Sequence, residues 1–330
     1  ASGAGFTTAQ VLARRLQRHF TGNPHFEGLP KKFKIAVETS ERSGRHLIQD
    51  VGLVLTGCAE GIDLYDVWIA GGLGREPRPG FRLREGVPAP ELLSLIEAIV
   101  RTYAKHAPAP KRLKFLAASH GENGLRELIA AELGETPKDF PLPASDVSLT
   151  PAPAAAPLEV PVFAGEMPAS QLRRLATLAR AEAGGALVVS CDQNILFYPV
   201  DGAARERLIA ALASSSLNGS GREAQVTFRI CPGDHECRMG LSATRDLARE
   251  ALAAMSDQAA GLSWAISGCP NACSQPQLAD IGIITRKRQR DAAGTLQPRF
   301  ELLRRSDSGF ATTITDDLDQ SALLAAITAL

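Results

Sequence analysis

The sequence predicts an α+β fold in which two similar units flank a smaller domain. The first observation is an internal repeat, because the pattern of residues 8–100 recurs at 244–330. The second is a Pro- and Ala-rich stretch, residues 141–160, whose composition is typical of an extended linker. The third is the segment 161–241, which precedes the second copy of the repeat and has no counterpart before the first.

Each copy of the repeat contains the same elements in the same order. An amphipathic helix comes first, followed by a short strand, a polar turn and a second strand. The second strand opens with Asp-Val-Gly at Asp50 in the first copy and with Asp-Ile-Gly at Asp280 in the second. A further strand and a closing amphipathic helix complete each copy. This shared order favours a repeat over a chance similarity of two αβ patterns.

The segment 161–241 has its own pattern. Gln171, Leu172, Leu175 and Leu178 follow a helical spacing, which predicts a capped amphipathic helix, and a glycine turn and two strands come after it. By symmetry, a similar segment should precede the first copy. The chain is therefore expected to be part of a larger, pseudo-symmetric unit.

Charge and hydropathy exclude several classes of function. The formal net charge is zero, so nothing indicates a nucleic-acid-binding or membrane-binding surface. No apolar run is long enough for a membrane span, and the first residues lack the features of a secretory signal. A chain of 330 residues with 45% hydrophobic residues can form more than one core. We expect a cytoplasmic protein.

The chain has six cysteines, four of which cluster between Cys231 and Cys273. Clustered cysteines in a chain without secretory features favour a metal centre over disulfides. The remaining two, Cys58 and Cys191, stand alone and are expected to be small buried side chains.

The spacing of the four clustered cysteines favours an iron–sulfur cluster. Cys231 and Cys237 form a C-x5-C pair, and Cys269 and Cys273 form a C-x3-C pair. Zinc sites mostly use pairs separated by two to four residues, so the wider spacing makes zinc the weaker alternative. Four thiolates on wider loops suit a cubane cluster, in which each cysteine binds a different iron. We expect His235 to be an exposed loop residue and not a ligand.

Two lysines near the start of the first copy are candidate anion-binding residues. Lys32 and Lys34 flank Phe33 in a Lys-Phe-Lys run that we expect on a strand, with both lysines on one face. Two neighbouring ammonium groups repel each other, so the pair needs an anion or a carboxylate opposite.

Together these motifs resemble those of the siroheme and 4Fe-4S reductases of sulfite and nitrite. The resemblance includes C-x5-C, then Gly-Cys-Pro-Asn-x-Cys at 268–273 and Ala-Asp-Ile-Gly at 279–282. The runs LPKKFKIAV at 29–37 and VWIAGGLGREP at 67–77 are also similar to segments of that family, and residues 161–218 to its ferredoxin-like half-domain.

The resemblance implies a domain order. Residues 1–140 are expected to form the first siroheme-reductase repeat, and 141–160 the linker. The ferredoxin-like half-domain is expected at 161–218, and the second repeat, with the cluster and siroheme ligands, at 219–330. Because the family's catalytic arginines lie in a region without counterpart here, a second chain or an N-terminal fragment should complete the fold.

The resemblance also implies two cofactors, a 4Fe-4S cluster and siroheme. Cys273 would bind both the cluster and the siroheme iron, while Lys32 and Lys34 would hold the substrate. Pro270 and Asn271 suit a tight turn, and Gly268 would allow the backbone to approach a cofactor closely. The expected siroheme contacts, besides Cys273, are Gly71, Gly72, Asn271, Gln275 and Arg75. Lys111, Arg112 and Lys114 are further candidate partners for siroheme carboxylates, with a surface role as the alternative.

The activity implied is the six-electron reduction of sulfite to sulfide. Reduction of nitrite to ammonia within the same family is the first alternative. A precorrin-3B synthase-like enzyme and a cofactor-carrying subunit of a split reductase are two others. The expected partners are a small anionic substrate and an electron donor such as ferredoxin or a flavoprotein.

Overall fold

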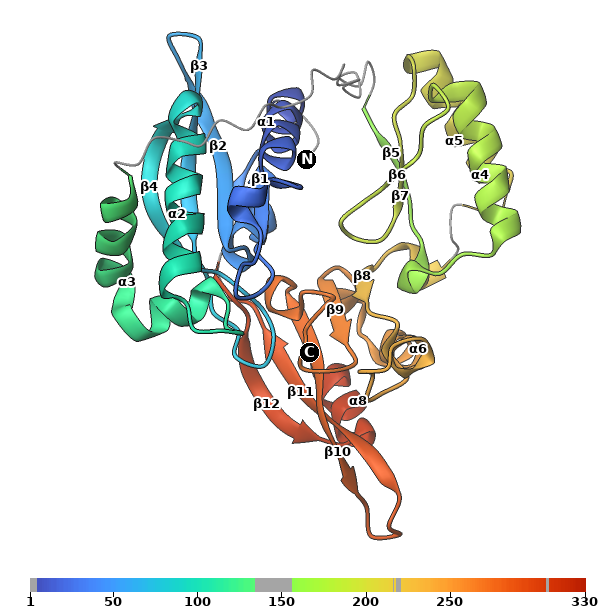
Figure 1. Cartoon of the computed structure of the whole chain (residues 1–330). Helices are drawn as coiled ribbons and strands as arrows, with labels where there is room; N and C mark the ends of the chain where they lie inside the picture. Colours follow the sequence, from blue (N-terminus) through green and yellow to red (C-terminus); the bar gives the residue numbers. More distant parts are fainter. Residues whose placement is uncertain (1–4, 134–155, 216, 218–220, 307–308) are drawn as a thin grey trace. The chain divides into compact units, whose positions relative to one another are not determined.

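A computed structural model describes residues 5–133, 156–215, 217, 221–306 and 309–330. The chain divides into two compact units, residues 1–152 and 153–330 (Figure 1). Within the described residues, no helix is both long enough and apolar enough to cross a membrane.

The first unit is a four-stranded sheet covered by helices. Its strands follow the order β1-β2-β3-β4, with β1 parallel to β2 and the other pairs antiparallel. The elements are α1 (Phe6–Phe20), β1 (Ile35–Glu38), β2 (Val51–Ala59), β3 (Ile62–Ile69), β4 (Phe81–Pro88), α2 (Leu92–His106) and α3 (Leu113–Glu132).

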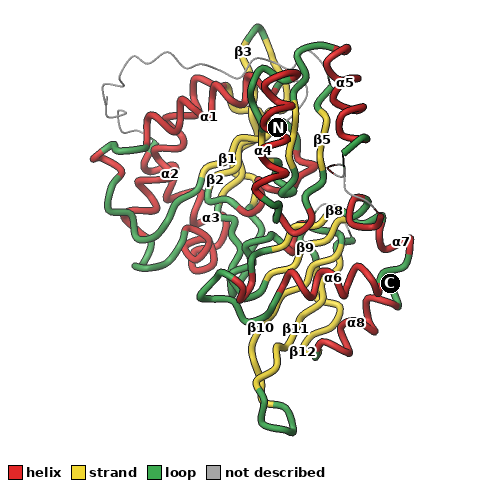
Figure 2. The backbone as a smooth tube through the Cα atoms, turned by 90° about the vertical axis from the view of Figure 1, so that its right-hand side faces the viewer, coloured by secondary structure: helices red, strands yellow, loops and turns green. Residues whose placement is uncertain are grey.

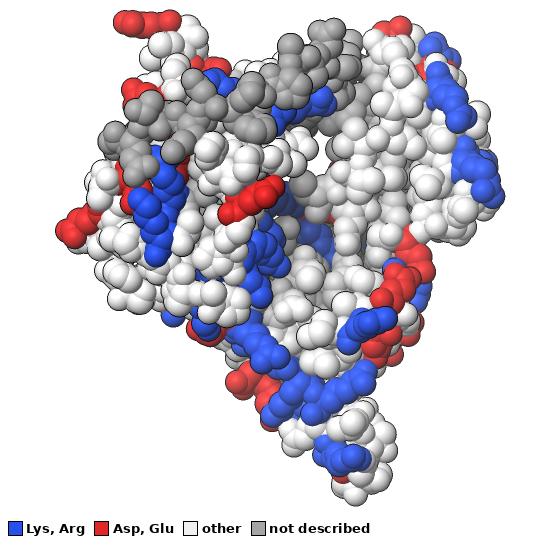
Figure 3. Space-filling model, viewed as in Figure 1, with Lys and Arg blue, Asp and Glu red and all other residues white. Residues whose placement is uncertain are grey.

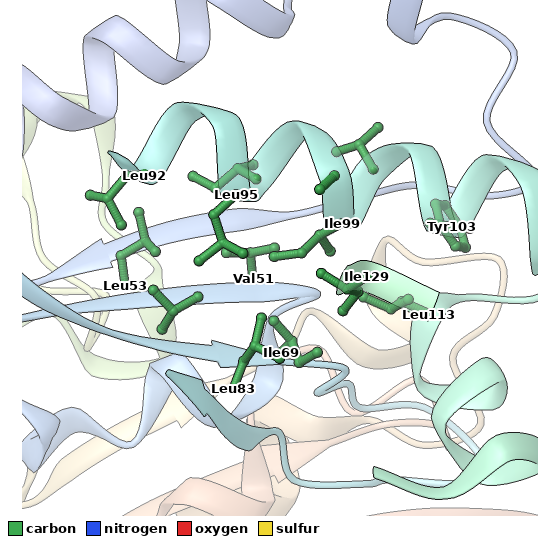
Figure 4. Packing of buried hydrophobic residues seen from close by; sticks show 14 of the residues in the cluster. Val51, Leu53, Ile69, Leu83, Leu92, Leu95, Ile99, Tyr103, Leu113 and Ile129 are labelled. Atoms are coloured by element: carbon green, nitrogen blue, oxygen red, sulfur yellow. The ribbon is translucent and has the colours of Figure 1, made fainter. Parts of the chain in front are cut away.

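The core of the first unit lies between α2 and the sheet (Figure 4). From α2, Leu95 and Ile99 point toward Val51 and Leu53 of β2, and all four are at most 2% exposed. Ile129 of α3 closes one end of this cluster. Burying each such side chain stabilises the fold by about 1.5–3 kcal/mol, so the apolar periodicity of α2 places it against the sheet.

The second unit begins with a small three-stranded sheet in the order β5-β7-β6, packed with two helices. The elements are β5 (Leu158–Val160), α4 (Ala169–Glu182), β6 (Val188–Val189), β7 (Ile195–Phe197) and α5 (Gly202–Ala213).

Several details of this small domain differ from the sequence-based expectation. The predicted helix and two strands are present, but α4 follows Pro168 without a side-chain cap. Leu172 is 46% exposed, and the buried stripe runs through Leu175 and Ala179 instead. The expected linker overlaps β5 at its end, because residues 158–160 pair with β7. Residues 141–155 of that linker lie outside the described residues.

The remainder of the second unit is a five-stranded sheet in the order β12-β11-β10-β9-β8. Helices α6 and α8 lie beside each other against this sheet (Figure 2). The elements are β8 (Thr227–Ile230), α6 (Thr244–Ala254), α7 (Asp257–Ala260), β9 (Ser263–Ser267), β10 (Ile281–Arg290), β11 (Leu296–Arg304), β12 (Thr312–Leu318) and α8 (Gln320–Thr328).

The two large sheets share a strand pairing and a hydrogen bond. In each, a parallel pair (β1 and β2, or β9 and β10) is followed by two antiparallel strands. The carboxylate of Asp50 accepts the N–H of Lys34 at 2.9 Å, and that of Asp280 accepts the N–H of Ser263 at 2.8 Å. Each aspartate thus ties the start of its strand to the start of the preceding one.

The glycine two positions after each aspartate also has one role in both sheets. A Cβ at Gly52 would lie 2.6 Å from the carbonyl oxygen of His46, and a Cβ at Gly282 would lie 2.4 Å from that of Pro276. In both cases the turn that enters the strand folds back onto the glycine. The Asp-x-Gly motif therefore recurs because the same close approach recurs.

Asp50 makes an additional ion pair, and no such pair is found for Asp280 among the described residues. The guanidinium of Arg112 donates to Asp50 through Nη2 at 2.8 Å and Nε at 3.3 Å, and Nη2 also reaches the carbonyl oxygen of Gly71 at 3.3 Å. Burial raises the pKa of Asp50, and the hydrogen bond and charge of Arg112 oppose this shift. Of the two readings of Arg112, a siroheme partner or a surface residue, the surface role is wrong, because the residue is only 9% exposed.

Lys114 is likewise buried, which excludes the alternative of a surface role. It is 3% exposed, and its Nζ donates to the carbonyl oxygens of Leu73 at 3.0 Å and Glu76 at 2.5 Å. Burial lowers the pKa of Lys114 to about 8, and the charge of Arg112 adds to this effect. Lys114 and Arg112, which lie at the start of α3, thus bind the loop that follows β3.

We expect Asp50→Ala to lower the free energy of unfolding of the first unit by about 3–5 kcal/mol, because it leaves a buried guanidinium without its carboxylate. Asp280→Ala is the matched control. It should lower the free energy of unfolding of the second unit by about 1–3 kcal/mol, because it removes hydrogen bonds only. Trp68 and Trp264 are the two tryptophans, one in each unit. Unfolding in urea is followed by tryptophan fluorescence. In each experiment the tryptophan of the other unit is replaced by Phe, so that the signal reports one unit only. Equal losses would contradict the contribution of Arg112.

We expect the stability of the wild-type protein, relative to Lys114→Met, to rise between pH 8 and 10.5. In this window the unfolded lysine, with its ordinary pKa of 10.5, still holds a proton that the folded one, with a pKa of about 8, has lost. Stability rises with pH wherever the unfolded state binds more protons. Urea unfolding at a series of pH values measures the difference. A difference that stays flat through this window would contradict the shifted pKa.

Candidate functional site

The first cysteine pair lies on a loop that leaves β8. The N–H of Cys231 donates to the carbonyl oxygen of Ile266 on β9 at 3.1 Å, so the loop starts from the end of the sheet. A short 3-10 turn, Gly233–His235, follows, and the N–H of Cys237 donates to the carbonyl oxygen of Gly233 at 3.1 Å. Cys237 and His235 are exposed, as expected for His235.

The second cysteine pair lies on the tight turn between β9 and β10. The N–H of Ala272 donates to the carbonyl oxygen of Cys269 at 3.2 Å. The hydroxyls of Ser267 and Ser274 lie 2.7 Å apart and close the base of the turn. Cys269 is 8% exposed and Cys273 is exposed. The turn therefore holds one thiol inside and presents the other outward.

Asn271 and Gln275 belong to this same turn. Asn271 is exposed, while Gln275 is half-buried and has a φ of 60°. Ala272 also has a positive φ, 55°. Two non-glycine residues in the left-handed region within four positions indicate a backbone that its surroundings hold in place.

The two cysteine loops pack directly against each other. The N–H of Gly268 donates to the Sγ of Cys231 at 3.0 Å, and the N–H of Leu241 donates to the carbonyl oxygen of Gly268 at 2.7 Å. A Cβ at Gly268 would lie 2.9 Å from the Cα of Gly233. The close approach that Gly268 allows is therefore between the loops, whereas the sequence suggested an approach to a cofactor.

The four cysteines do not form a single-ion site among the described residues. Among the residues that the structure describes, no three His, Cys, Asp or Glu side chains lie close enough to hold one ion. A cubane distributes its ligands over separate irons, so its thiolates need not converge on one point. Hydrogen bonds to the ligand sulfurs are one means of tuning such a cluster, and Gly268 donates one to Cys231.

The two solitary cysteines differ from the expectation of burial, since both are exposed. Cys58 lies in the outer half of β2, where residues 56–59 extend beyond the core. Cys191 lies in the turn between β6 and β7. Cysteine's preference for burial did not hold because both positions lie beyond the packed part of their sheets.

Arg229 supports the second cysteine turn, and the sequence analysis did not identify it. The side chain is 7% exposed, and its Nε donates to the carbonyl oxygen of Ser274 at 3.2 Å. Its Nη1 donates to the carboxylate of Asp192 at 2.9 Å. Beside it, the side-chain amide of Gln193 exchanges two hydrogen bonds with the backbone of Ile230. An arginine inside the apolar run of a strand was the available signal.

The two candidate substrate lysines lie in the first unit. Lys32 and Lys34 are exposed, and Phe33 between them packs on Tyr103 with ring centroids 5.5 Å apart. As expected, the two lysines lie on one face and Phe33 on the other. The Lys-Phe-Lys run precedes the strand, however, because β1 begins at Ile35. Phe33 fixes the alternation by its packing, without a strand ladder.

Gly71, Gly72 and Arg75 follow β3 in the same unit. A Cβ at Gly71 would lie 2.1 Å from the carbonyl oxygen of Leu47, and one at Gly72 would lie 2.7 Å from Nη1 of Arg112. These glycines are thus required by the chain's own packing. Arg75 is exposed. Through Asp50 and Arg112, this loop is connected to the backbone of Lys34.

A basic surface on the β10–β11 hairpin is largely neutralised. Figure 3 shows Lys and Arg side chains gathered where Figure 1 places this hairpin. Arg288 pairs with Asp234 at 2.7 Å, and Lys287 pairs with Asp317 at 3.0 Å. These two cations of the surface thus have carboxylate partners within the protein.

Family models match two parts of the chain. The nitrite and sulphite reductase 4Fe-4S domain matches residues 3–137, and the nitrite/sulfite reductase ferredoxin-like half domain matches residues 158–215. The first match contains a single cysteine, Cys58. The four clustered cysteines lie outside both matches, so their assignment depends on their spacing and on the packing of their loops.

Known proteins of the same kind are similar over most of this chain. Sulfite reductase [ferredoxin] of Mycobacterium tuberculosis strain ATCC 25618 / H37Rv is 26% identical over 80% of this chain and 51% of its own length. Ferredoxin--nitrite reductase of Synechococcus elongatus is 26% identical over 86% of this chain and 58% of its own length. The chain thus spans about half the length of these relatives.

The fold has a counterpart among solved structures. The structure of the Mycobacterium tuberculosis NirA protein superimposes with a TM-score of 0.76 and 22% identity. The superposition covers 97% of this chain and 63% of the NirA chain. With the two matched domains and the similarity over about four-fifths of the chain, these findings establish that the chain belongs to the nitrite and sulfite reductase family.

Proposed function

We propose that this chain takes part in the six-electron reduction of sulfite to sulfide, with a 4Fe-4S cluster and siroheme as cofactors. The observation that carries the proposal is the joining of the two cysteine loops, in which Gly268 bonds both Sγ of Cys231 and the backbone of Leu241. Loops joined in this way can present four thiols to one cluster. When bound, the two cofactors supply the electron-transfer chemistry, and the protein supplies ligands, orientation and charge.

The proposed cluster ligands are Cys231, Cys237, Cys269 and Cys273. Cys273 is also the proposed link to siroheme, and its exposure supports a role at the outer side of the turn. The buried Arg229 fixes the backbone next to it through Ser274, so it is a positioning residue for this ligand. A rigid support of this kind holds a ligand in the geometry that it needs.

The proposed siroheme contacts, besides Cys273, are the five residues that the sequence motifs indicated. Asn271 and Gln275 flank Cys273 on its turn, and Arg75 offers an exposed guanidinium for a carboxylate. Gly71 and Gly72 would contribute only backbone, because their own packing leaves no space for a side chain. Arg112 and Lys114 would act indirectly, since they hold this loop and are occupied within the protein.

Lys32 and Lys34 are the proposed substrate-binding residues. Their exposed ammonium groups would bind an anion, stabilise the negative charge that develops on it, and donate protons. Phe33 and Asp50 position them, the first through Tyr103 and the second through the backbone of Lys34. An anion held between two lysines would also relieve their mutual repulsion.

We further propose that the first unit and residues 219–330 are two copies of one siroheme-reductase repeat, with the ferredoxin-like half-domain between them. The shared strand pairing and the shared carboxylate-to-backbone hydrogen bond support this proposal. The proposed electron donor is ferredoxin or a flavoprotein, since the mycobacterial and cyanobacterial relatives are named as ferredoxin enzymes.

Nitrite reduction is the second candidate function. The nitrite reductase of Synechococcus elongatus is as similar to this chain as the mycobacterial sulfite reductase is, at 26% identity. Lys34 favours sulfite as the first candidate, because a second cation suits the more highly charged anion.

We expect the protein to contain about four irons and four acid-labile sulfides per chain, as for one cubane cluster. Replacing any of the four proposed ligands by Ser should lower both contents, because each ligand binds a separate iron. Cys58→Ser is the matched control, since Cys58 is exposed and lies in the other unit. Iron and sulfide analysis measures the outcome. Stoichiometric zinc without sulfide would contradict the cluster.

We expect Lys32→Gln and Lys34→Gln each to reduce turnover by about 10²–10³-fold, because they remove charge from the site where the anion reacts. Arg15→Gln, on an exposed face of α1, is the control and should keep wild-type turnover. Oxidation of reduced methyl viologen with sulfite or nitrite measures the rates and identifies the preferred anion. If both lysine variants turn over like the wild type, the substrate site lies elsewhere.

A further inference from the structure

One turn of the ferredoxin-like half-domain contacts both loops that carry the clustered cysteines. This turn, residues 190–194, joins β6 to β7, and we call it the half-domain turn. One of its side chains, Gln193, bonds to the end of β8, directly before Cys231. The neighbouring Asp192 reaches the backbone after Cys273 through a buried arginine. The half-domain turn therefore adjoins one cysteine of each pair.

The side-chain amide of Gln193 takes the place of a neighbouring strand at the end of β8. Its Nε2 donates to the carbonyl oxygen of Ile230 at 3.0 Å, and its Oε1 accepts the N–H of Ile230 at 2.7 Å. Among the described residues, β8 is the terminal strand of its sheet, so this edge has no strand beside it. The following residue, Cys231, is bonded to β9 on the opposite side through its N–H. The backbone that leads into Cys231 is therefore held from both sides.

The backbone of the half-domain turn is strained at Gln193. Its φ is 67°, in the left-handed region, where glycine and asparagine are the favoured residues. The hydroxyl of Ser190 accepts the N–H groups of Asp192 and Asn194. The turn is therefore closed without any contribution from the side chain of Gln193. Strained positions of this kind cluster at functional sites, and here the side chain serves the contact with β8.

Arg229 connects the half-domain turn to the second cysteine turn. The carboxylate of Asp192 accepts a hydrogen bond from Nη1 of Arg229 at 2.9 Å. On its other side, Nε of Arg229 donates to the carbonyl oxygen of Ser274 at 3.2 Å, and Nη2 donates to that of Gln275 at 3.4 Å. Arg229 is 7% exposed, and a buried charge acts strongly on its surroundings because the local dielectric constant is low. Asp192 thus both aims this guanidinium and offsets its charge beside the turn of Cys273.

A second contact fixes the half-domain against the same strand. Phe163, which precedes α4, packs on Phe228 of β8 with ring centroids 5.7 Å apart. The adjacent Ala164 is 3% exposed and belongs to the core of the five-stranded sheet. The N–H of Val162 donates to the side chain of Asn194 at 2.9 Å, which ties this anchor to the half-domain turn. Apolar burial therefore holds the turn in place in addition to its own hydrogen bonds.

We propose that Asp192 and Gln193 are positioning residues for the iron–sulfur cluster. The inference rests on the proposed function, in which Cys231 and Cys273 are cluster ligands. Gln193 holds the strand end before Cys231, so it limits the opening of the cysteine loops and slows the loss of the cluster. Asp192 holds Arg229 and sets the net charge beside the turn of Cys273. Net charge near an iron–sulfur cluster is one determinant of its reduction potential.

The rate of cluster loss tests the contribution of Gln193. We expect Gln193→Gly to raise the rate of iron release to a ferrous chelator by about tenfold, because the N–H and C=O of Ile230 lose their partner. Glycine adopts a positive φ freely, so the half-domain turn itself should stay folded, which circular dichroism verifies. Gln297→Ala is the matched control, since this exposed amide bonds to Asp291 of its own hairpin. It should release iron at the wild-type rate.

The reduction potential of the cluster tests the contribution of Asp192. We expect Asp192→Asn to raise the midpoint potential, because the guanidinium of Arg229, no longer offset, favours the added electron. Asp192→Glu keeps the charge and should restore the wild-type potential. Asp257→Asn is the matched control, because it removes an exposed carboxylate from Arg222, another arginine of the same unit, before β8 begins. Its potential should equal that of the wild type. Electron paramagnetic resonance at a series of poised potentials measures these values.

Two kinds of result would overturn this inference while leaving the proposed cluster in place. One is iron release at the wild-type rate in Gln193→Gly, or an unchanged potential in Asp192→Asn. The other is an equal change in a variant and in its control, because the effect would then not come from the half-domain turn. A wild-type protein without iron and sulfide would instead contradict the proposed function, and the inference with it.

Discussion

A carboxylate that bonds to the backbone of the preceding strand organises both large sheets. Asp50 and Asp280 each stand at the entry of a central strand, and each accepts the first N–H of the parallel strand beside it. A parallel pair needs a crossover connection, and its register is not set by a tight hairpin. The carboxylate supplies that register. The glycine two residues later lets the connecting segment pass against the strand.

The proposed functional residues lie at opposite ends of equivalent segments. In the second unit, the connection between the parallel strands carries Cys269 and Cys273. In the first unit, the equivalent connection, residues 39–50, has no cysteine, and the candidate residues Lys32 and Lys34 precede the first strand of the pair. The same strand pairing thus carries thiols in the second unit and cations in the first. This follows from the physics of the fold, because the strand pairing constrains Asp and Gly but leaves the connecting residues free to differ.

Buried basic residues act as internal supports in both units. Arg112 and Lys114 occupy carbonyl oxygens of the loop after β3, and Arg229 occupies those of the second cysteine turn. Loops rich in glycine or in left-handed residues have few side chains to pack, so carbonyl groups are the contacts that they offer. An arginine or lysine, with several donors, can satisfy more than one of them. The order of these loops therefore depends on buried cations within the protein.

The sequence by itself determined the elements that local patterns control. Apolar periodicity specified α1, α2, α4, α6 and α8, and the Asp-x-Gly motifs located the paired strands, because side-chain period and backbone geometry are local properties. Cysteine spacing is also a local property, and it predicts the cluster. Only the tertiary structure decided that Cys58 and Cys191 are exposed, that Arg112 and Lys114 are buried, and that Gly268 serves loop packing. These outcomes depend on contacts with residues that are distant in the sequence, such as Asp50 and Gly233. No local sequence pattern encodes which distant residue a side chain will contact.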